Sequence, residues 1–135
     1  MRLSKHYNLK EFTRSQTAVE KNFTEQFTPG SDIVGNLTAL CENVLQPLRY
    51  NFMAMLYVTS GYRCERLNTA IKGTFNSDHM KGMAADVTCK DVEGLYQLAQ
   101  LLDLPYKQLI YYKSKNFVHI SYDPSDIRRQ NWILT

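Results

Sequence analysis

Apolar residues recur at steps of three or four between Ser31 and Phe52. The stripe consists of Ile33, Leu37, Leu40, Val44 and Leu48. Residues three and four positions apart share one face of a helix, so this spacing predicts an amphipathic helix. Ser31 or Asp32 would be its N-cap, and Pro47 would bend it near its end.

A second helix is predicted from Asp91, a suitable N-cap, to Leu102. Its stripe is Val92, Leu95, Leu98, Leu101 and Leu102. Shorter helical turns are expected at residues 9–14 and 66–71. Residues 23–30 and 72–78 contain Gly, Pro, Asn and Ser and are predicted to be loops.

Strand-like patterns occupy four other segments. Residues 53–60 form an apolar run that predicts a buried strand entering a turn at Gly61, and residues 84–89 predict a short strand. Residues 108–112 and 117–122 flank a polar tetrapeptide, which predicts an antiparallel pair. With no repeat or linker, residues 1–135 are expected to form one α+β domain, with a small antiparallel sheet and helices packed on one side.

Composition narrows the class of protein. The chain has 135 residues, 44% hydrophobic and 21% charged, which is typical of a globular domain. No run approaches the roughly 18 apolar residues of a membrane helix, and residues 1–10 lack the apolar core of a signal peptide. The expectation is a soluble monomer, cytoplasmic on synthesis, with no membrane partner. The net charge of +3 is too small to indicate a nucleic-acid partner.

The three cysteines, Cys41, Cys64 and Cys89, are odd in number and include no Cys-x-x-Cys pair. This pattern argues against a disulfide framework or a thiolate zinc finger, so all three are expected to be reduced and structural. A nucleophilic pair of Cys64 and His79 is conceivable, but a buried thiol is the simpler interpretation.

The candidate chemistry centres on two of the three histidines. His79 lies in a loop, and His119 lies in a predicted strand. Asp86 falls inside an apolar strand, where its carboxylate needs a cation, a metal or several hydrogen-bond donors. Two histidines and an aspartate could bind zinc and leave a fourth position open, as catalytic sites require. From the residues alone, a satisfied strand histidine and an ion pair between Asp86 and Arg63 remain the simpler interpretation.

A resemblance changes this balance. Residues 77–86 match the pattern S-x-H-x-x-G-x-A-x-D, and with the later His119 they resemble the signature of the zinc D-Ala-D-Ala peptidase family. That family includes carboxypeptidases, dipeptidases, phage L-alanyl-D-glutamate endolysins and the related hedgehog domain. Residues 4–18, 43–49, 58–68 and 117–130 are similar to a small bacterial and phage subgroup. The resemblance implies the hedgehog/DD-peptidase fold.

The resemblance also implies roles for individual residues. His79, Asp86 and His119 match the zinc ligands, and Arg63 matches the arginine thought to bind the substrate carbonyl or the developing oxyanion. Its alternative role is an ion pair with Asp86. Ser77 matches a serine that supports the substrate or the loop, and its alternative role is simply to cap the turn.

The chain departs from the family pattern at the catalytic acid. The positions that carry a carboxylate in relatives hold Asn116, Tyr112 and Lys107 here. A displaced acid could serve as the base, with Asp78 nearest in sequence and Asp123 and Glu65 as further candidates. The simpler interpretation of Asp78 is a surface charge on its loop.

The aromatic residue at position 112 offers a second route. Tyr112 could orient or protonate the leaving group while the zinc-activated water attacks without a base, at a cost of about a hundred- to ten-thousand-fold in rate. In a third case, hydrolysis is lost altogether. Aromatic residues around the last histidine could line a peptide groove or belong to the core. They are Tyr111, Tyr112, Phe117 and Tyr122.

The expected function is therefore that of a zinc metallopeptidase cutting an amide bond in the peptide stem of peptidoglycan, as a D,D-carboxypeptidase or an endolysin-type endopeptidase. The alternative is a catalytically impaired zinc-containing module that binds peptidoglycan or has a structural role in a phage. The missing signal peptide fits a phage protein that acts on the cell wall. Four basic residues, Lys113, Lys115, Arg128 and Arg129, could face this anionic polymer or form a solvated surface.

Overall fold

A computed structural model describes residues 1–135. Along the chain the elements are β1 (Arg2–Ser4), β2 (Tyr7–Asn8), α1 (Leu9–Thr13), α2 (Gln16–Glu20), η1 (Thr24–Phe27), α3 (Ser31–Leu40), η2 (Cys41–Leu45), α4 (Gln46–Phe52), β3 (Tyr57–Ser60), α5 (Glu65–Ala70), η3 (Asp78–Lys81), β4 (Ala84–Thr88), α6 (Val92–Leu101), β5 (Gln108–Tyr112), β6 (Phe117–Ser121) and β7 (Gln130–Leu134). None of the helices combines the length and apolar character that crossing a membrane requires.

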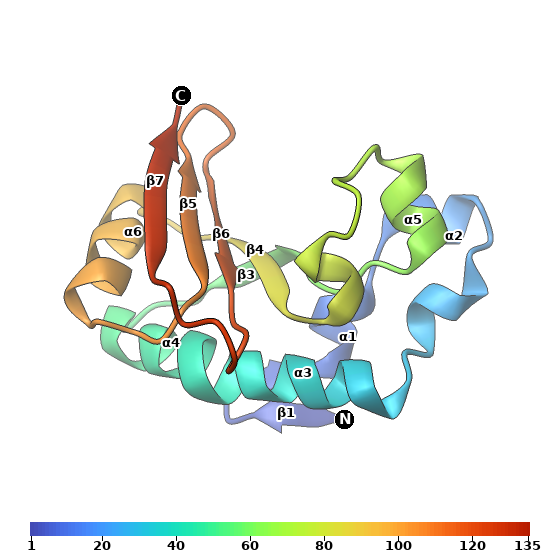
Figure 1. Ribbon diagram of the computed structural model, residues 1–135, viewed down its shortest axis with the longest axis horizontal. Helices are drawn as coiled ribbons and strands as arrows, with labels where there is room; N and C mark the ends of the chain where they lie inside the picture. The colour runs from blue at the N-terminus through green and yellow to red at the C-terminus, as the bar shows by residue number, and fades with distance from the viewer.

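The main sheet has five strands in the order β3-β4-β6-β5-β7. Neighbouring strands are antiparallel except β5 and β7, which are parallel. The α+β class is confirmed, and the predicted hairpin of β5 and β6 is present. The sheet is antiparallel as expected apart from its edge strand β7, which is parallel to β5 and lies in a segment for which no strand was predicted. In Figure 1, β7 ends at the C-terminus beside β5.

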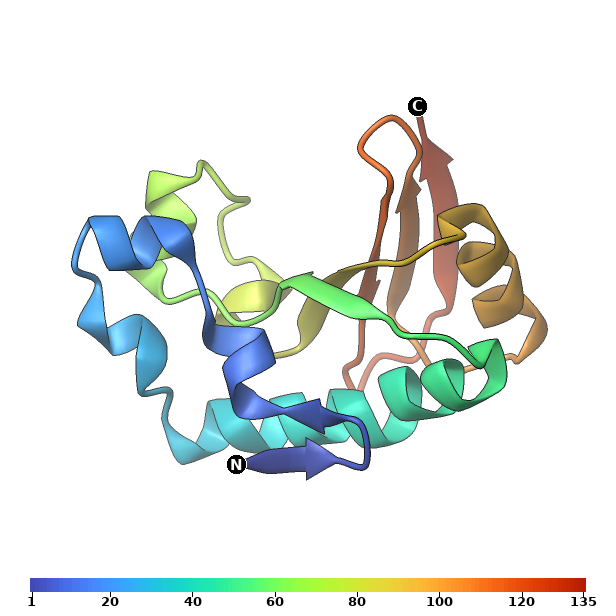
Figure 2. The same cartoon turned by 180° about the vertical axis from the view of Figure 1, so that it is seen from behind.

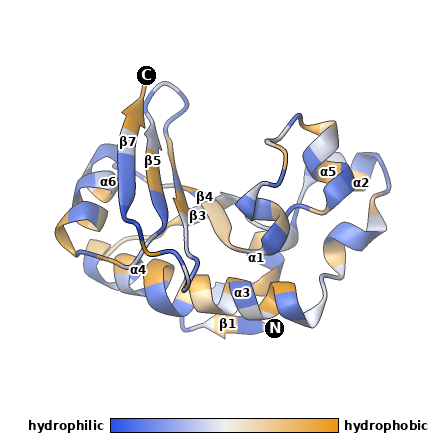
Figure 3. Ribbon diagram, viewed as in Figure 1, coloured by the Kyte–Doolittle hydropathy of each residue, from blue (hydrophilic) through white to orange (hydrophobic).

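One face of this sheet packs against helices. The side chains of Val87, Leu109, Val118 and Ile120 are fully buried in the same core as Leu48 of α4. Figures 1 and 2 show α3 and α4 as one long helical segment beneath the strands, with α6 beside them. In Figure 3 this segment alternates between hydrophobic and hydrophilic residues, as expected for a helix with one buried side. The other face of the sheet is left free of these helices.

The long helix contains the irregularity that its proline predicts. Residues 41–45 form a π-helical turn directly before Pro47, and the Gln46 N–H donates to the carbonyl of Cys41, five residues back. Proline has no N–H and its ring crowds the carbonyl four residues earlier, so the regular ladder cannot continue through it. The N-cap is Gly30 rather than Ser31 or Asp32.

Several other boundaries differ from the prediction. The apolar run at residues 53–60 was expected to be a buried strand, but β3 starts only at Tyr57, whose surface is 52% exposed. Met53 instead ends α4 in a left-handed conformation, with φ of 60°. The predicted loop at 23–30 contains the short helix η1. The pair β1 and β2, which lies against the long helix, was not predicted.

Candidate metal centre

The sheet register brings two of the candidate ligands together on the open face. Asp86 of β4 pairs directly with His119 of β6, so their side chains point to the same side. His79 reaches the same point from η3, which packs against β4. Potential ligand atoms of His79, Asp86 and His119 all lie within 4.8 Å of one another. The geometry therefore joins the three residues named by the sequence motif.

The ring of His79 is oriented by the backbone. Its Nδ1 lies 2.7 Å from the carbonyl oxygen of Gly61, and since a carbonyl only accepts, Nδ1 carries the proton and donates it. The Nε2 atom is then left with a free lone pair in the neutral ring. Gly61 is needed here because a Cβ would lie 2.6 Å from the Cα of Phe12 in α1.

The Nε2 atom of His79 is buried and makes no hydrogen bond. It faces Oδ1 of Asp86 at 3.3 Å, and that same oxygen lies 3.0 Å from Nδ1 of His119. Two lone pairs facing each other across 3.3 Å repel unless a cation lies between them. A metal ion satisfies this requirement, and a set of two imidazoles and one carboxylate is suited to zinc with an open fourth position.

Asp86 stays ionised in this setting. Burial by itself would raise the pKa of its carboxyl, but the hydrogen bond with the His119 imidazole acts in the opposite direction, and the pKa lies well below its usual range. Its second oxygen, Oδ2, lies 3.4 Å from Nη2 of Arg63. The carboxylate is thus available to a metal on one side and to the guanidinium on the other.

Arg63 stands next to the ligand cluster on the loop between β3 and α5. Its Nε donates to the Ser60 hydroxyl at 3.1 Å, and its Nη1 lies 3.4 Å from Oδ1 of Asn68. The alternative ion pair with Asp86 is therefore present, at the long distance of 3.4 Å. Burial lowers the pKa of Arg63, and the Asp86 carboxylate opposes that change. Arg63 also lines the cleft, where its charge can face a ligand.

A buried glutamine that the sequence did not reveal holds this loop in place. Gln26 in η1 has no exposed surface. Its Nε2 donates to the carbonyls of Thr13 at 2.9 Å and Tyr62 at 2.8 Å, and its Oε1 accepts from the Cys64 N–H at 2.8 Å. Gln26 thus bonds to the residues on both sides of Arg63. A polar residue within a predicted loop carries no sequence signal for this role.

The open face forms one wall of a cleft of about 660 Å³. Besides the three candidate ligands, its lining includes Arg63, Ser77, Asp78 and Tyr112. Of the carboxylates considered as the base from the sequence, Asp78 lines this cavity, whereas Glu65 and Asp123 do not. The volume of the cavity falls in the range of small-molecule and peptide sites.

Tyr112 belongs to the cleft and Tyr111 to the core, because consecutive strand residues point to opposite faces. The Tyr112 ring stacks on Phe117 with 4.6 Å between centroids. Burial raises the pKa of Tyr112, and the Asp86 carboxylate raises it further against the opposing effect of Arg63. The phenol therefore keeps its proton at neutral pH and is a hydrogen-bond donor.

The interpretation of Asp78 as a surface charge was wrong. Its side chain is only 12% exposed, and its Oδ2 lies 3.0 Å from Nζ of Lys107. Both residues line the cleft. Lys107 thus neutralises the carboxylate that lies nearest in sequence to His79. The remaining candidates are elsewhere: Glu65 lines a second, adjacent pocket, and Asp123 accepts from the hydroxyl of Ser125.

The turn that presents His79 has its own supports. The Ser77 hydroxyl accepts from the His79 N–H at 3.2 Å, so its capping role is observed. Gly82 ends the turn with φ of +72°, and a Cβ there would lie 2.8 Å from the carbonyl oxygen of Ile33. Only glycine fits both the conformation and this close approach.

The cysteines are all free, as expected, and Cys64 is buried at the start of α5. Among the basic residues considered as wall contacts, Lys115 lines the cleft, whereas Arg128 pairs with Asp126 and Arg129 with Asp103. Arg128 and Arg129 therefore already have acidic partners within the chain.

Comparison with known proteins agrees with this geometry. No curated protein matches the chain. A family model described as peptidase M15 matches residues 5–121, which include the three candidate ligands, Arg63 and Tyr112. This family consists of zinc peptidases, and the match extends over most of the chain. The chain belongs to the peptidase M15 family.

Proposed function

We propose that this chain hydrolyses an amide bond in the peptide stem of peptidoglycan with the help of zinc. The observation that carries the proposal is the convergence of His79, Asp86 and His119 at one point of a cleft, with a buried, unpartnered Nε2 on His79. Family membership supports the reaction class.

In this proposal His79, Asp86 and His119 hold the metal. When bound, zinc polarises the scissile carbonyl and lowers the pKa of a coordinated water toward about 7. Gly61 fixes the tautomer of His79 that such binding needs, since its carbonyl takes the Nδ1 proton. Arg63, held by Ser60, places a permanent positive charge where the carbonyl oxygen becomes negative.

Proton transfer is assigned to the residues that the cleft offers. Tyr112 is protonated and lines the cleft, so it can donate to the leaving amine. Asp78 is the remaining carboxylate of the cleft besides Asp86, and a carboxylate in this position can accept a proton. We therefore assign donation to Tyr112 and treat Asp78 as the competing base candidate.

A second candidate function is a zinc-containing module that binds stem peptide without cutting it. The observation that favours it is the pairing of Asp78 with Lys107, because this leaves no unpaired carboxylate in the cleft to act as base. The two functions share the metal centre and differ only in turnover.

The primary test joins two measurements on the purified protein. Zinc content is determined by mass spectrometry, and release of free amine from purified peptidoglycan is followed with and without a chelator. Stoichiometric zinc and chelator-sensitive release are expected. Zinc without release would favour the binding module, and no zinc would refute the ligand assignment.

Two histidine variants provide a matched comparison. His79→Gln should lose zinc and activity, whereas His6→Gln should keep both, since His6 lies on the exposed turn between β1 and β2 and contacts Gln46. Equal loss in both variants would point to misfolding rather than to a ligand.

Two further variants separate the proton-transfer assignments. Tyr112→Phe keeps the stacked ring but removes the hydroxyl, and it should lower kcat by about a hundredfold or more with zinc retained. Asp78→Asn should have the larger effect if Asp78 is the base. The identity of the released amine distinguishes a D,D-carboxypeptidase from an endopeptidase.

A further inference from the structure

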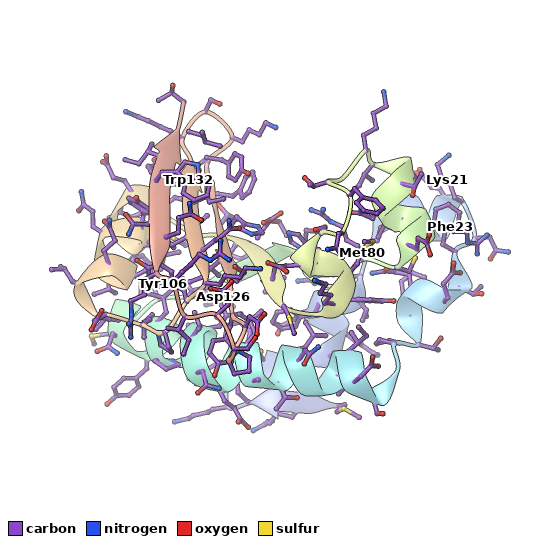
Figure 4. The ribbon with its side chains drawn as sticks, in the orientation of Figure 1. Lys21, Phe23, Met80, Tyr106, Asp126 and Trp132 are labelled. Atoms are coloured by element: carbon purple, nitrogen blue, oxygen red, sulfur yellow. The ribbon has the colours of Figure 1, made fainter.

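The last strand of the sheet brings a residue to the cleft that neither the sequence motif nor the family match includes. Trp132 lies on β7, beyond the matched residues 5–121, and it lines the cleft together with the candidate metal ligands. Figure 4 shows it on β7, across the molecule from Met80, which belongs to the turn that carries His79. Trp132 is therefore part of the wall opposite that turn.

The strand register gives the distance across the sheet between Trp132 and His119. Ile110 of β5 pairs with His119 on one side and with Trp132 on the other. Directly paired residues point to the same face, and strands are about 4.8 Å apart, so Trp132 is displaced by about 10 Å from His119 across the sheet. An extended peptide advances about 3.3 Å per residue, so this displacement corresponds to about three residues.

The same cleft is also lined by Gly73, Thr74 and Asn76 of the loop between α5 and η3. Figure 1 shows this loop and β7 on opposite sides of β4. The cleft is therefore lined from both sides of the strand that carries Asp86. A site of this shape has room for chain on both sides of a reacting amide.

Trp132 has the properties of a binding platform. Its side chain is only partly buried on the edge strand, although a tryptophan is a costly residue to leave facing water. Its neighbours on the same strand, Asn131 and Ile133, are more exposed and do not line the cleft. An indole of this kind gains stability by covering its ring with an apolar group of a ligand.

We propose that Trp132 positions the substrate by packing against an apolar part of the peptide about three residues from the scissile amide. The cleft then selects an extended stem peptide over a free dipeptide. This inference rests on the proposed function, since it concerns the peptide that the same site would take.

The chain itself supplies the probe, because Trp132 is its single tryptophan. The zinc-loaded protein is titrated with synthetic stem peptides of two, three and five residues while tryptophan emission and binding heat are both recorded. The five-residue peptide should bind and move the emission to shorter wavelength, because the indole loses contact with water. The dipeptide should leave the emission unchanged.

Three variants complete the test by calorimetry. Trp132→Ala should weaken binding of the five-residue peptide about three- to tenfold, which corresponds to the loss of one aromatic packing contact. Trp132→Phe should recover much of that affinity. Ile133→Ala is the control, because Ile133 is 50% exposed on the same strand and lies outside the cleft.

The outcomes separate the two proposals. Binding of the five-residue peptide with unchanged emission, and with equal affinity for Trp132→Ala, would overturn the inference and leave the proposed function standing. Failure of every stem peptide to release binding heat would remove the proposed function and the inference with it.

Discussion

Replacing Gln26 with leucine tests whether one buried amide holds the loop that carries Arg63. Leucine keeps a similar volume and an apolar surface, so the substitution removes hydrogen bonds without opening a large cavity. The side chain has no exposed surface, and the three backbone groups it serves belong to Thr13, Tyr62 and Cys64. After the change, two carbonyls and one N–H lose these hydrogen bonds.

The loss in free energy of unfolding follows from these three backbone groups. A buried polar group left without a partner costs about 1–3 kcal/mol, so three of them at the low end of that range give about 3 kcal/mol. For a chain of this length, such a loss lowers Tm by roughly 10 °C. Because a typical domain has about 5–15 kcal/mol of stability, the variant should still fold.

Urea denaturation followed by circular dichroism measures the free energy of unfolding, and zinc content and amine release are measured well below the transition. Gln16→Leu is the control, since Gln16 is exposed and bonds only to the nearby Glu20 side chain; its effect should stay within about 0.5 kcal/mol. We expect Gln26→Leu to keep zinc but to lower activity, because the backbone on both sides of Arg63 loses its hydrogen bonds to Gln26. A loss of under about 1 kcal/mol with an unchanged m-value would show that these three hydrogen bonds do not stabilise the loop.

Two other predictions concern stability and thiol chemistry. Gly82→Ala should lower the free energy of unfolding by about 2 kcal/mol, because alanine would have to adopt φ of +72° and its Cβ would press on a backbone carbonyl. Gly35→Ala, at an open helical position, should raise it by about 0.5–1 kcal/mol. Urea titrations of both variants check the sign of each change. Burial raises the pKa of Cys41 to about 12, so its thiol stays protonated at pH 8. Iodoacetamide should label the half-buried Cys89 first in the native protein, and mass spectrometry showing early modification of Cys41 or Cys64 would contradict this.

Local patterns were sufficient for much of the fold. The apolar stripe at 31–52 and the N-cap of Asp91 mark helices because they depend on residues three and four apart. The hairpin of β5 and β6 depends on two short runs and the turn between them. Strand β7 gave no such signal, since four of its five residues are exposed and its pairing with β5 is parallel.

The candidate metal centre was also predicted only in part from the sequence. The motif at residues 77–86 and the later His119 named the candidate ligands, because a family motif is a property of sequence alone. Their spacing in the chain says nothing of the contact between Nδ1 of His79 and the carbonyl of Gly61, or of the pairing of Asp78 with Lys107. These contacts join residues 18 and 29 positions apart.

Local sequence patterns thus specify the residue types at the metal centre and the helices and hairpin that lie near it. Which groups meet depends on the packing of the whole chain. A backbone carbonyl sets the tautomer of His79, a lysine neutralises Asp78, and the indole of Trp132 lies about 10 Å across the sheet from His119. Strand register and helix packing select among residues that are distant in the chain, and a one-residue change in register would turn the same side chains to the other face of the sheet.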